Sequence, residues 1–436
     1  MMKKNRTIYF LLALVCLGLQ SCLFQEEDYF DDSSANRATA DVKRCSELLE
    51  AAPNGWVMEY YVGKDYSLGG ITLLCKFDGQ RVPMASQIAG ADETVSSLYS
   101  VKSEQATMLS FDTYNYLVHY FGQPQGSMAD DPNGTLGGDY EFVISDATAD
   151  RIELKGKKYG NRIVMKAFSA DQTWKQYLTK IKKVEDDAFF YEYDLRMDGL
   201  YTGQMLRSNY TFIVTYYDEV GKVHQKTVPF MFTTDGMRFH EPVTIDGQTM
   251  QNFVWKNEEI SFVCTDEGAT EVKLAGVYTA GYQSYDYYPG TYQMDFYRLN
   301  DATNQMEVAS QEIQLVKDED GKSYWLKGLE YDILVTYDKP RGGLSILPQF
   351  LKKVQGGYVY LAMWDLMNDY VLRSSAIGLI SYPTTDGIYL VDNGVWMGEI
   401  SGFIFGVYDS QDEEASFMGY TDAVAAIRLI KKTIEE

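Results

Sequence analysis

Short β-prone runs separated by turn-rich breaks constrain the fold of this chain more than any other feature. From residue 272 onward they follow one another at regular spacing: Thr291–Leu299, Glu307–Val316, Ser323–Leu329, Glu330–Tyr337 and Leu344–Ile346. Glycine, asparagine and aspartate are frequent in the breaks, as in hairpin turns. This pattern predicts an antiparallel β-sandwich or barrel-like domain over residues 272–436. Its last segment, residues 421–434, fits either a final strand or a terminal helix.

The preceding residues, 38–268, combine strands with two helices and predict an α+β domain. Before the stop Pro53-Asn54-Gly55, apolar residues recur at the helical period of 3.6: Ala38, Val42, Cys45, Leu48, Leu49 and Ala52. The second helix is introduced by Ser169 and Gln172, which have the spacing of a capping box. Its apolar stripe consists of Trp174, Tyr177, Leu178, Ile181 and Val184. With the domain boundary placed at residues 266–275, the expected fold class is mainly β.

The first 21 residues have the composition of an export signal. A basic start precedes an apolar run, residues 8–19, which is too short to span a bilayer, since spanning takes about 20 residues. The run ends in Leu19-Gln20-Ser21-Cys22, which resembles the bacterial lipobox and implies cleavage before Cys22 and acylation of its sulfur. Residues 22–37 are acidic and predict a flexible tether; acidic residues directly behind the cysteine also resemble the surface-export signal of Bacteroidetes lipoproteins. An ordinary secretory signal with an incidental cysteine is the alternative.

The charge of the chain excludes several classes of partner. Asp and Glu number 62 against 39 Lys and Arg, a net charge of −23, and removal of the signal, with its three basic residues, leaves −26. Such a chain lacks the basic surface by which proteins bind nucleic acids, so we expect no nucleic-acid partner. The same charge disfavours direct binding to anionic lipids. The resemblance to surface-exported lipoproteins implies that the lipid on Cys22 holds the protein in the outer membrane, on the cell surface, and the acyl chains supply the membrane affinity.

The sequence contains none of the common catalytic or metal-binding motifs. The histidines His119, His224 and His240 form no His-Glu-x-x-His pair, and neither Gly-x-Ser-x-Gly nor a phosphate-binding Gly-rich loop occurs. Three further cysteines, Cys45, Cys75 and Cys264, lack metal-ligand spacing and could form at most one disulfide. Cys45 lies on the apolar face of the first helix and Cys75 in an apolar run, so these two are expected to be buried thiols. We therefore expect no enzyme activity, no cofactor and no metal site.

One set of candidate ligand-contacting residues is polar: Asp112, Asn115, His119, Asp139 and Glu141. The set could form a small polar site or an acid–base pair. The alternative is that Asp112 and Asn115 cap turns while Asp139 ends the Gly137-Gly138 loop. The same loop offers the hard oxygen ligands that calcium prefers, at Asp130, Asp131, Asn133 and Asp139. It lacks EF-hand spacing, however, and is interpreted as an exposed polar loop.

A second set is aromatic and clusters around Pro289-Gly290: Tyr282, Tyr285, Tyr287, Tyr288 and Tyr292. Phenol rings can stack on the C–H groups of sugar rings and donate hydrogen bonds, and tyrosine is enriched in protein-binding surfaces. This set is therefore a candidate ligand-binding surface. The alternative is that the rings pack into the core of the second domain.

Several segments occur behind the lipobox in a characteristic order: Pro53–Trp56, Leu109–His119, Gly137–Phe142, Ile152–Asn161 and Thr234–Pro242. Together they resemble a family of Bacteroidetes outer-membrane lipoproteins carrying a domain of unknown function, over about residues 22–265. The resemblance implies no catalytic residue. It implies a place beside nutrient-uptake systems that pair an outer-membrane transporter with a surface glycan-binding lipoprotein. We expect a non-enzymatic protein that captures extracellular glycans; a structural or adhesive protein-binding module is the second hypothesis and an extracellular hydrolase the third.

Overall fold

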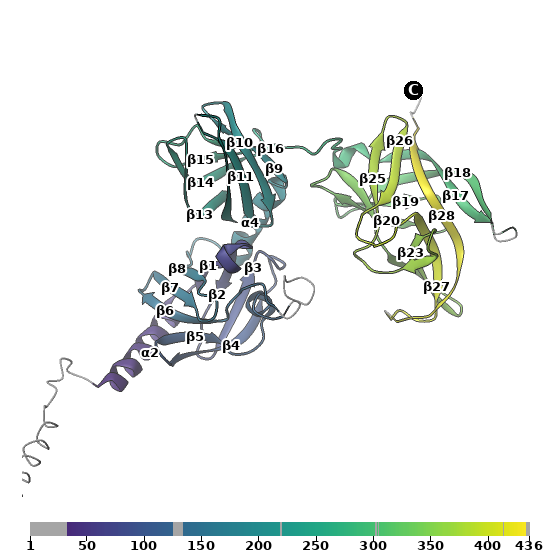
Figure 1. The fold of residues 1–436 in the computed structure, drawn as a ribbon. Coiled ribbons are helices and arrows are strands. Elements are labelled where there is room, and N and C mark those ends of the chain that lie inside the picture. Colours follow the sequence, from purple (N-terminus) through teal and green to yellow (C-terminus); the bar gives the residue numbers. More distant parts are fainter. Residues whose placement is uncertain are drawn as a thin grey trace, which may run out of the picture.

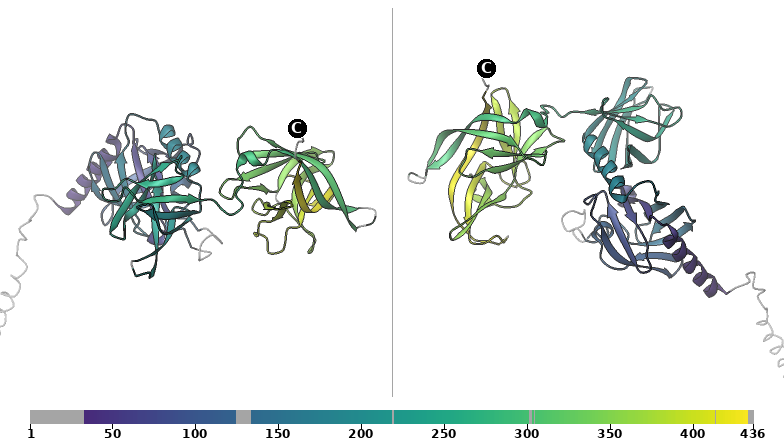
Figure 2. Two further views of the ribbon diagram at one scale, coloured as in Figure 1. Left: turned by 90° about the horizontal axis from the view of Figure 1, so that it is seen from above. Right: turned by 180° about the vertical axis from the view of Figure 1, so that it is seen from behind.

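The computed structural model describes residues 33–124, 134–218, 220–300, 303, 305–412 and 414–432. Three β-rich units follow one another in this part of the chain, each around its own buried apolar cluster (Figure 1). The third unit follows the first two through an extended connection (Figure 2). The prediction of a mainly β fold is therefore confirmed. The lipobox with Cys22 and residues 22–32 of the expected tether lie outside the described residues, among which no helix is long and apolar enough to cross a membrane.

The first unit is a closed barrel of eight antiparallel strands that pair in chain order. It closes where Trp56 in its first strand lies opposite Ala167 in its last. The strands are β1 (Trp56–Val62), β2 (Gly69–Cys75), β3 (Arg81–Ser86), β4 (Val95–Ser103), β5 (Thr107–Phe111), β6 (Glu141–Ala147), β7 (Arg151–Gly156) and β8 (Arg162–Ala167). Two short helices, η2 (Lys64–Tyr66) and α3 (Tyr116–His119), lie in its connections. Closure leaves the sheet without an unpaired edge.

Helix α2 (Ser34–Ala51) packs against β4, β5 and β6 of this barrel. The apolar face predicted for it is confirmed, because Cys45 and Leu49 are buried. The indole N–H of Trp56 donates to the carbonyl oxygen of Leu49 at 2.8 Å and so fixes the helix to the strand that follows it. The helix begins at Ser34, capped by Ser33. Residues 34–37 are therefore helical, which corrects the expected end of the tether.

The second unit is also a closed barrel of eight antiparallel strands. Its first and last strands pair, with Arg196 opposite Lys273. The strands are β9 (Glu192–Met197), β10 (Leu200–Ser208), β11 (Thr211–Tyr217), β12 (Val223–Phe232), β13 (Gly236–Ile245), β14 (Gln248–Lys256), β15 (Ser261–Cys264) and β16 (Lys273–Val277).

Helix α4 (Trp174–Asp187) connects the two barrels and packs on both. Leu178 lies in a cluster with side chains of the first barrel, whereas Ile181 and Val184 belong to the core of the second. The capping box is formed by Thr173 and Gln176, four residues later than the pair that we expected. The hydroxyl of Thr173 accepts from the N–H of Gln176, and the amide oxygen of Gln176 accepts from the N–H of Thr173.

The third unit closes a further ring of eight strands. The path β17-β18-β19-β20-β21-β25-β26-β28 returns to β17, with Tyr292 opposite Lys431, and β27, β23, β22 and β24 extend from β28. The strands are β17 (Gly290–Asn300), β18 (Gln305–Lys317), β19 (Ser323–Lys327), β20 (Ile333–Asp338), β21 (Gly343–Ile346), β22 (Gln349–Val354), β23 (Gly357–Asp365), β24 (Tyr370–Leu372), β25 (Leu379–Thr384), β26 (Gly387–Asp392), β27 (Gly402–Tyr408) and β28 (Phe417–Lys431). The 3-10 helix η4 (Tyr285–Tyr287) precedes them. As far as it is described, the last segment, for which strand and helix were both possible, is thus a strand that ends at Lys431.

The division into units differs from the expected domains. The interval 38–268 contains the whole first barrel and most of the second, not one domain. The expected boundary at 266–275 falls on the turn between β15 and β16 and on the start of β16. Since β16 pairs with β9 to close the second barrel, that unit extends to Val277, and residues 278–289 connect it to the third.

Candidate functional site

The tyrosine cluster lies mostly in the core of the third unit. Tyr288 and Tyr292 have no exposed surface. The hydroxyl of Tyr288 donates to the carbonyl oxygen of Gly342 at 2.9 Å, and that of Tyr292 donates to the carbonyl oxygen of Tyr288 at 2.7 Å. Tyr285 stacks on the buried ring of Tyr324. The structure therefore corrects the expectation that these three residues form a ligand-binding surface. Their rings pack in the third unit, and their hydroxyls donate to backbone carbonyl oxygens.

The remaining two tyrosines are also engaged within the protein. The ring of Tyr282 stacks on Phe189, with centroids 6.0 Å apart and planes at 16°. Tyr287 is exposed, but the ammonium group of Lys431 lies 4.9 Å from its ring centroid. The five tyrosines therefore do not form one surface. Tyr285, Tyr288 and Tyr292 pack in the third unit, Tyr282 contacts Phe189 next to the second barrel, and Tyr287 is exposed.

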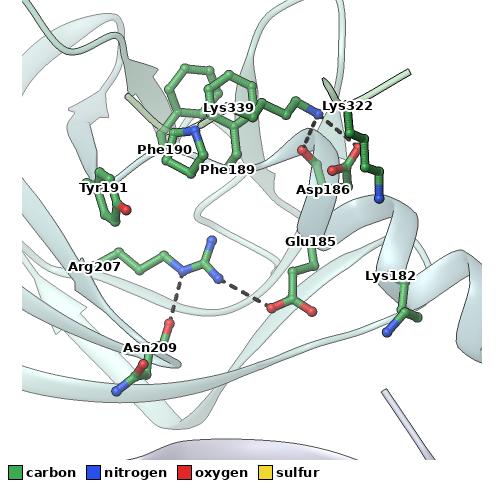
Figure 3. Close-up of a pocket in the computed structure, with 11 residues that line it drawn as sticks. Lys182, Glu185, Asp186, Phe189, Phe190, Tyr191, Arg207, Asn209, Lys322 and Lys339 are labelled. Atoms are coloured by element: carbon green, nitrogen blue, oxygen red, sulfur yellow. Dashed lines mark hydrogen bonds and ion pairs between the residues drawn. The ribbon is translucent and has the colours of Figure 1, made fainter. Parts of the chain in front are cut away.

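A hollow of about 510 Å³ marks the joint at which α4 and the second barrel meet the third unit (Figure 3). Lys339, in the turn after β20, donates to the backbone oxygen of Asp186 at 2.7 Å and to its carboxylate at 2.9 Å. Its ammonium group lies 4.9 Å from the ring centroid of Phe189. On the other side, Arg207 donates to the carbonyl oxygen of Ala188 at 2.9 Å. Lys339 and Arg207 are thus engaged by other groups of the protein. We therefore interpret this hollow as a contact between units and not as a ligand site.

In the polar set, the residues around α3 support local structure. The side-chain oxygen of Asn115 accepts from the N–H of Leu117 at 3.1 Å and caps the helix. Nδ1 of His119 lies 3.1 Å from the N–H nitrogen of Asn115, and Nε2 lies 3.2 Å from the carbonyl oxygen of Phe111. Asp112 is exposed and accepts from the hydroxyl of Ser100. Both ring nitrogens of His119 are therefore used by the backbone.

Asp139 and Glu141 lie beside this group, because the ring of Tyr140 between them stacks on His119 at 4.6 Å. Asp139 is buried and accepts from the N–H of Lys158 at 2.7 Å, which orders the turn after β7. Burial raises its pKa, although these amide hydrogen bonds oppose the rise. Glu141 pairs with Lys102 and Lys157. The structure thus brings the five polar residues to one region but gives each a structural partner. Asn115 caps a helix as the alternative expected, whereas Asp112 pairs with the side chain of Ser100.

Cys45 and Cys75 are free and buried, as predicted, and Cys264 is free and buried as well. Burial raises the pKa of the Cys264 thiol to about 11, so it stays protonated and unreactive at neutral pH. Within the described ranges, no group of three or more His, Cys, Asp or Glu side chains is arranged to hold a metal ion. Asp130, Asp131 and Asn133 of the loop weighed for calcium lie outside those ranges.

The third unit carries a groove of about 660 Å³ across β23, β27 and β28. The strand register places Tyr408 of β27 opposite Phe417 of β28. On its other side, Tyr408 lies opposite Tyr358 of β23, and Tyr360 follows two residues later on the same strand. The ring centroid of Tyr408 lies 5.5 Å from that of Phe417 and 5.7 Å from that of Tyr360. Three aromatic rings from three neighbouring strands therefore line one groove.

Polar groups border these rings. The guanidinium carbon of Arg373 lies 4.2 Å from the ring centroid of Tyr408 and 4.9 Å from that of Tyr360. Arg373 also donates to the backbone oxygen of Asp412 at 2.6 Å, which fixes the charge beside the rings. Exposed side chains of Ser374 and Gln411 add hydrogen-bonding groups. An aromatic surface with a few fixed polar groups is the usual composition of a small-molecule site.

The groove residues do not stand out in the sequence. Tyr360 and Phe417 are more than fifty residues apart, and they meet only because β23, β27 and β28 are neighbours in the sheet. The local signal is the alternation Tyr358-Val-Tyr360, which predicts a strand but not a site.

Comparison with known families places the chain. The model of a family described as a domain of unknown function (DUF4302) matches residues 26–257, more than half of the chain. The chain belongs to this family. In this DUF4302 protein the match covers α2, the whole first barrel, α4 and the second barrel through β14. A second family model, also described as a domain of unknown function, matches residues 265–404, which include part of the groove. No curated protein gives a significant match.

Proposed function

We propose that this protein is a non-enzymatic lipoprotein of the outer membrane of Bacteroidetes that captures extracellular glycans at the cell surface, beside a nutrient-uptake system. The lipobox and the acidic residues behind Cys22 support the location. The groove of the third unit supports the activity. The family match supports an uncharacterised domain and gives no substrate, so the chemistry of the groove carries the proposal.

The observation that carries it is the set of three aromatic rings beside Arg373. A sugar ring presents C–H groups on its faces and hydroxyl groups at its edges. The C–H groups can lie against the exposed ring of Phe417, while the hydroxyl groups bond to the polar border. Tyr408 is only 4% exposed, and its ring supports Phe417 from the core side of the groove.

Phe417→Ala should weaken glycan binding about tenfold, which corresponds to about 1.4 kcal/mol. The reason is the loss of one exposed stacking face, with little effect on folding because 45% of Phe417 is accessible. Affinity electrophoresis in gels containing polysaccharides selected on a glycan array measures the change. Tyr297→Ala is the matched control, because Tyr297 is exposed to the same extent on β17 and does not line the groove. A glycan that binds both variants and the wild type equally would place its site elsewhere.

A protein partner is the second candidate, and the outer face of the second barrel favours it. On β10 and β11 the exposed side chains of Leu206 and Ile213 lie opposite each other, and Tyr217 of β11 lies opposite Val223 of β12. Exposed apolar side chains on neighbouring strands are a feature of protein-binding surfaces. If the glycan array and the affinity gels both show no binding, this second function takes precedence.

A further inference from the structure

A hollow of about 390 Å³ lies between the two barrels, where β1, β7 and β8 of the first face β13 and β14 of the second. Four of its side chains are cations: Arg151, Arg162, Lys166 and Arg238. They come from three different strands, one of them in the second barrel. Such a concentration of basic groups is unexpected in a chain with a net charge of −23.

Two carboxylates pair with these four cations. Glu59 binds Lys166 at 2.8 Å and Arg238 at 2.6 Å. Glu153 binds Arg151 at 2.9 Å and Arg162 at 3.1 Å. Each carboxylate is thus shared by two cations, and the group keeps two positive charges in excess.

The hollow also holds a buried hydrogen-bonding group that no well-aligned partner satisfies. Tyr61 is only 4% exposed, and its hydroxyl lies beside the guanidinium of Arg238 without a hydrogen bond of good geometry to any described residue. A buried polar group of this kind is costly unless a ligand or water satisfies it. The hydroxyl lies near the charged group of Arg238, so donors of two kinds converge there.

The neighbouring histidine is consistent with a positive local field. His240 packs between the rings of Tyr61 and Tyr66, with centroids 4.3 and 4.2 Å away. Burial lowers its pKa, and the charges of Arg162 and Arg238 lower it further, whereas Glu241 opposes this shift. The imidazole is therefore neutral at neutral pH and forms an uncharged side of the hollow.

We propose that this hollow binds the oxyanion group of a small molecule, a carboxylate, sulfate or phosphate. The planar guanidinium groups match the paired oxygens of such groups, and Lys166 adds a compact charge. The hydroxyl of Tyr61 would donate to the same ligand. This site is separate from the aromatic groove and does not depend on it.

Isothermal titration of the mature chain with acetate, sulfate and phosphate, each alone at low ionic strength, tests the site and separates the carboxylate from the tetrahedral anions. Acetamide, which has nearly the shape of acetate but no charge, serves as the uncharged probe and should not bind. The double variant Arg151→Gln/Arg162→Gln should weaken binding of the preferred anion at least tenfold. Both side chains are substantially exposed, so the fold should tolerate the change.

Arg196→Gln is the matched control, because Arg196 is an exposed arginine that pairs with Asp194 on β9, outside the hollow. It should bind the anion as the wild type does. Equal weakening in the control and the double variant would show general attraction of counterions and overturn the proposal. Absence of binding of all three anions by the wild type at millimolar concentration would overturn it as well.

Discussion

Glu59→Gln is expected to melt about 6–12 °C below the wild type at pH 7. Glu59 is mostly buried between the barrels and holds Arg238 and Lys166 in ion pairs. Removing its charge leaves two cations without their partner, and loss of one member of a buried pair costs about 3 kcal/mol or more. In a unit of about 240 residues, each kcal/mol shifts the melting temperature by roughly 2–4 °C. Differential scanning calorimetry of the transition of the two barrels measures the shift.

The pH dependence of this difference provides a second test. Burial alone raises the pKa of Glu59, but the charges and hydrogen bonds of Arg238 and Lys166 outweigh burial and hold the pKa below the usual 4.5. A lowered pKa means that the pair stabilises the fold at pH values above 4.5 and that this stability is lost as the pH falls through the lower, folded value. The difference in melting temperature between the wild type and Glu59→Gln should therefore be constant near neutral pH and become smaller in acid.

The control is Glu259→Gln, which removes an exposed pair with Lys273 on the second barrel. Exposed pairs contribute about 0–1 kcal/mol, so the control should melt within a few degrees of the wild type. Equal decreases in melting temperature in both variants would contradict the conclusion that the ion pairs of Glu59 between the barrels stabilise the fold more than an exposed pair does.

Local patterns predicted the elements of this fold but not their closure into units. The apolar face of α2 was readable because Cys45 and Leu49 recur at helical spacing. Nothing local shows that β9 and β16 pair, because Arg196 and Lys273 are 77 positions apart in the sequence and meet only through the barrel. The expected boundary at 266–275 was placed at a polar turn, but this turn joins neighbouring strands inside the second barrel.

For the candidate sites too, local sequence patterns were informative and contacts between distant residues could not be predicted. Tyr292 was readable as a core residue, because Tyr292, Met294 and Phe296 alternate on β17 and all three are buried. The cluster of tyrosines in the sequence suggested a ligand-binding surface. The alternation of apolar and polar residues along the strand, however, places Tyr292 in the core. The pairing of Glu59 with Arg238 joins residues 179 positions apart, so their contact depends on the docking of two complete barrels.

Cys22→Ala should release the protein from the membrane fraction completely. Each buried CH₂ group of an acyl chain contributes about 0.8 kcal/mol to membrane binding, and stable anchoring takes more than one chain. The variant lacks the sulfur to which the lipid would be attached, and the acidic chain behind it has no affinity of its own for an anionic surface. Metabolic labelling with a radioactive fatty acid and detergent phase partition measure lipidation and anchoring separately.

Cys16→Ala is the matched control, because Cys16 lies in the apolar run of the expected signal and would be removed with it. It should keep both the acyl label and the membrane partition of the wild type. If Cys22→Ala stays in the membrane fraction and neither it nor the wild type carries the label, the lipid anchor is wrong. The proposed surface location would then lose its support, whereas the groove and its glycan assay would stand or fall on their own, since neither Tyr360 nor Phe417 depends on how the chain is held.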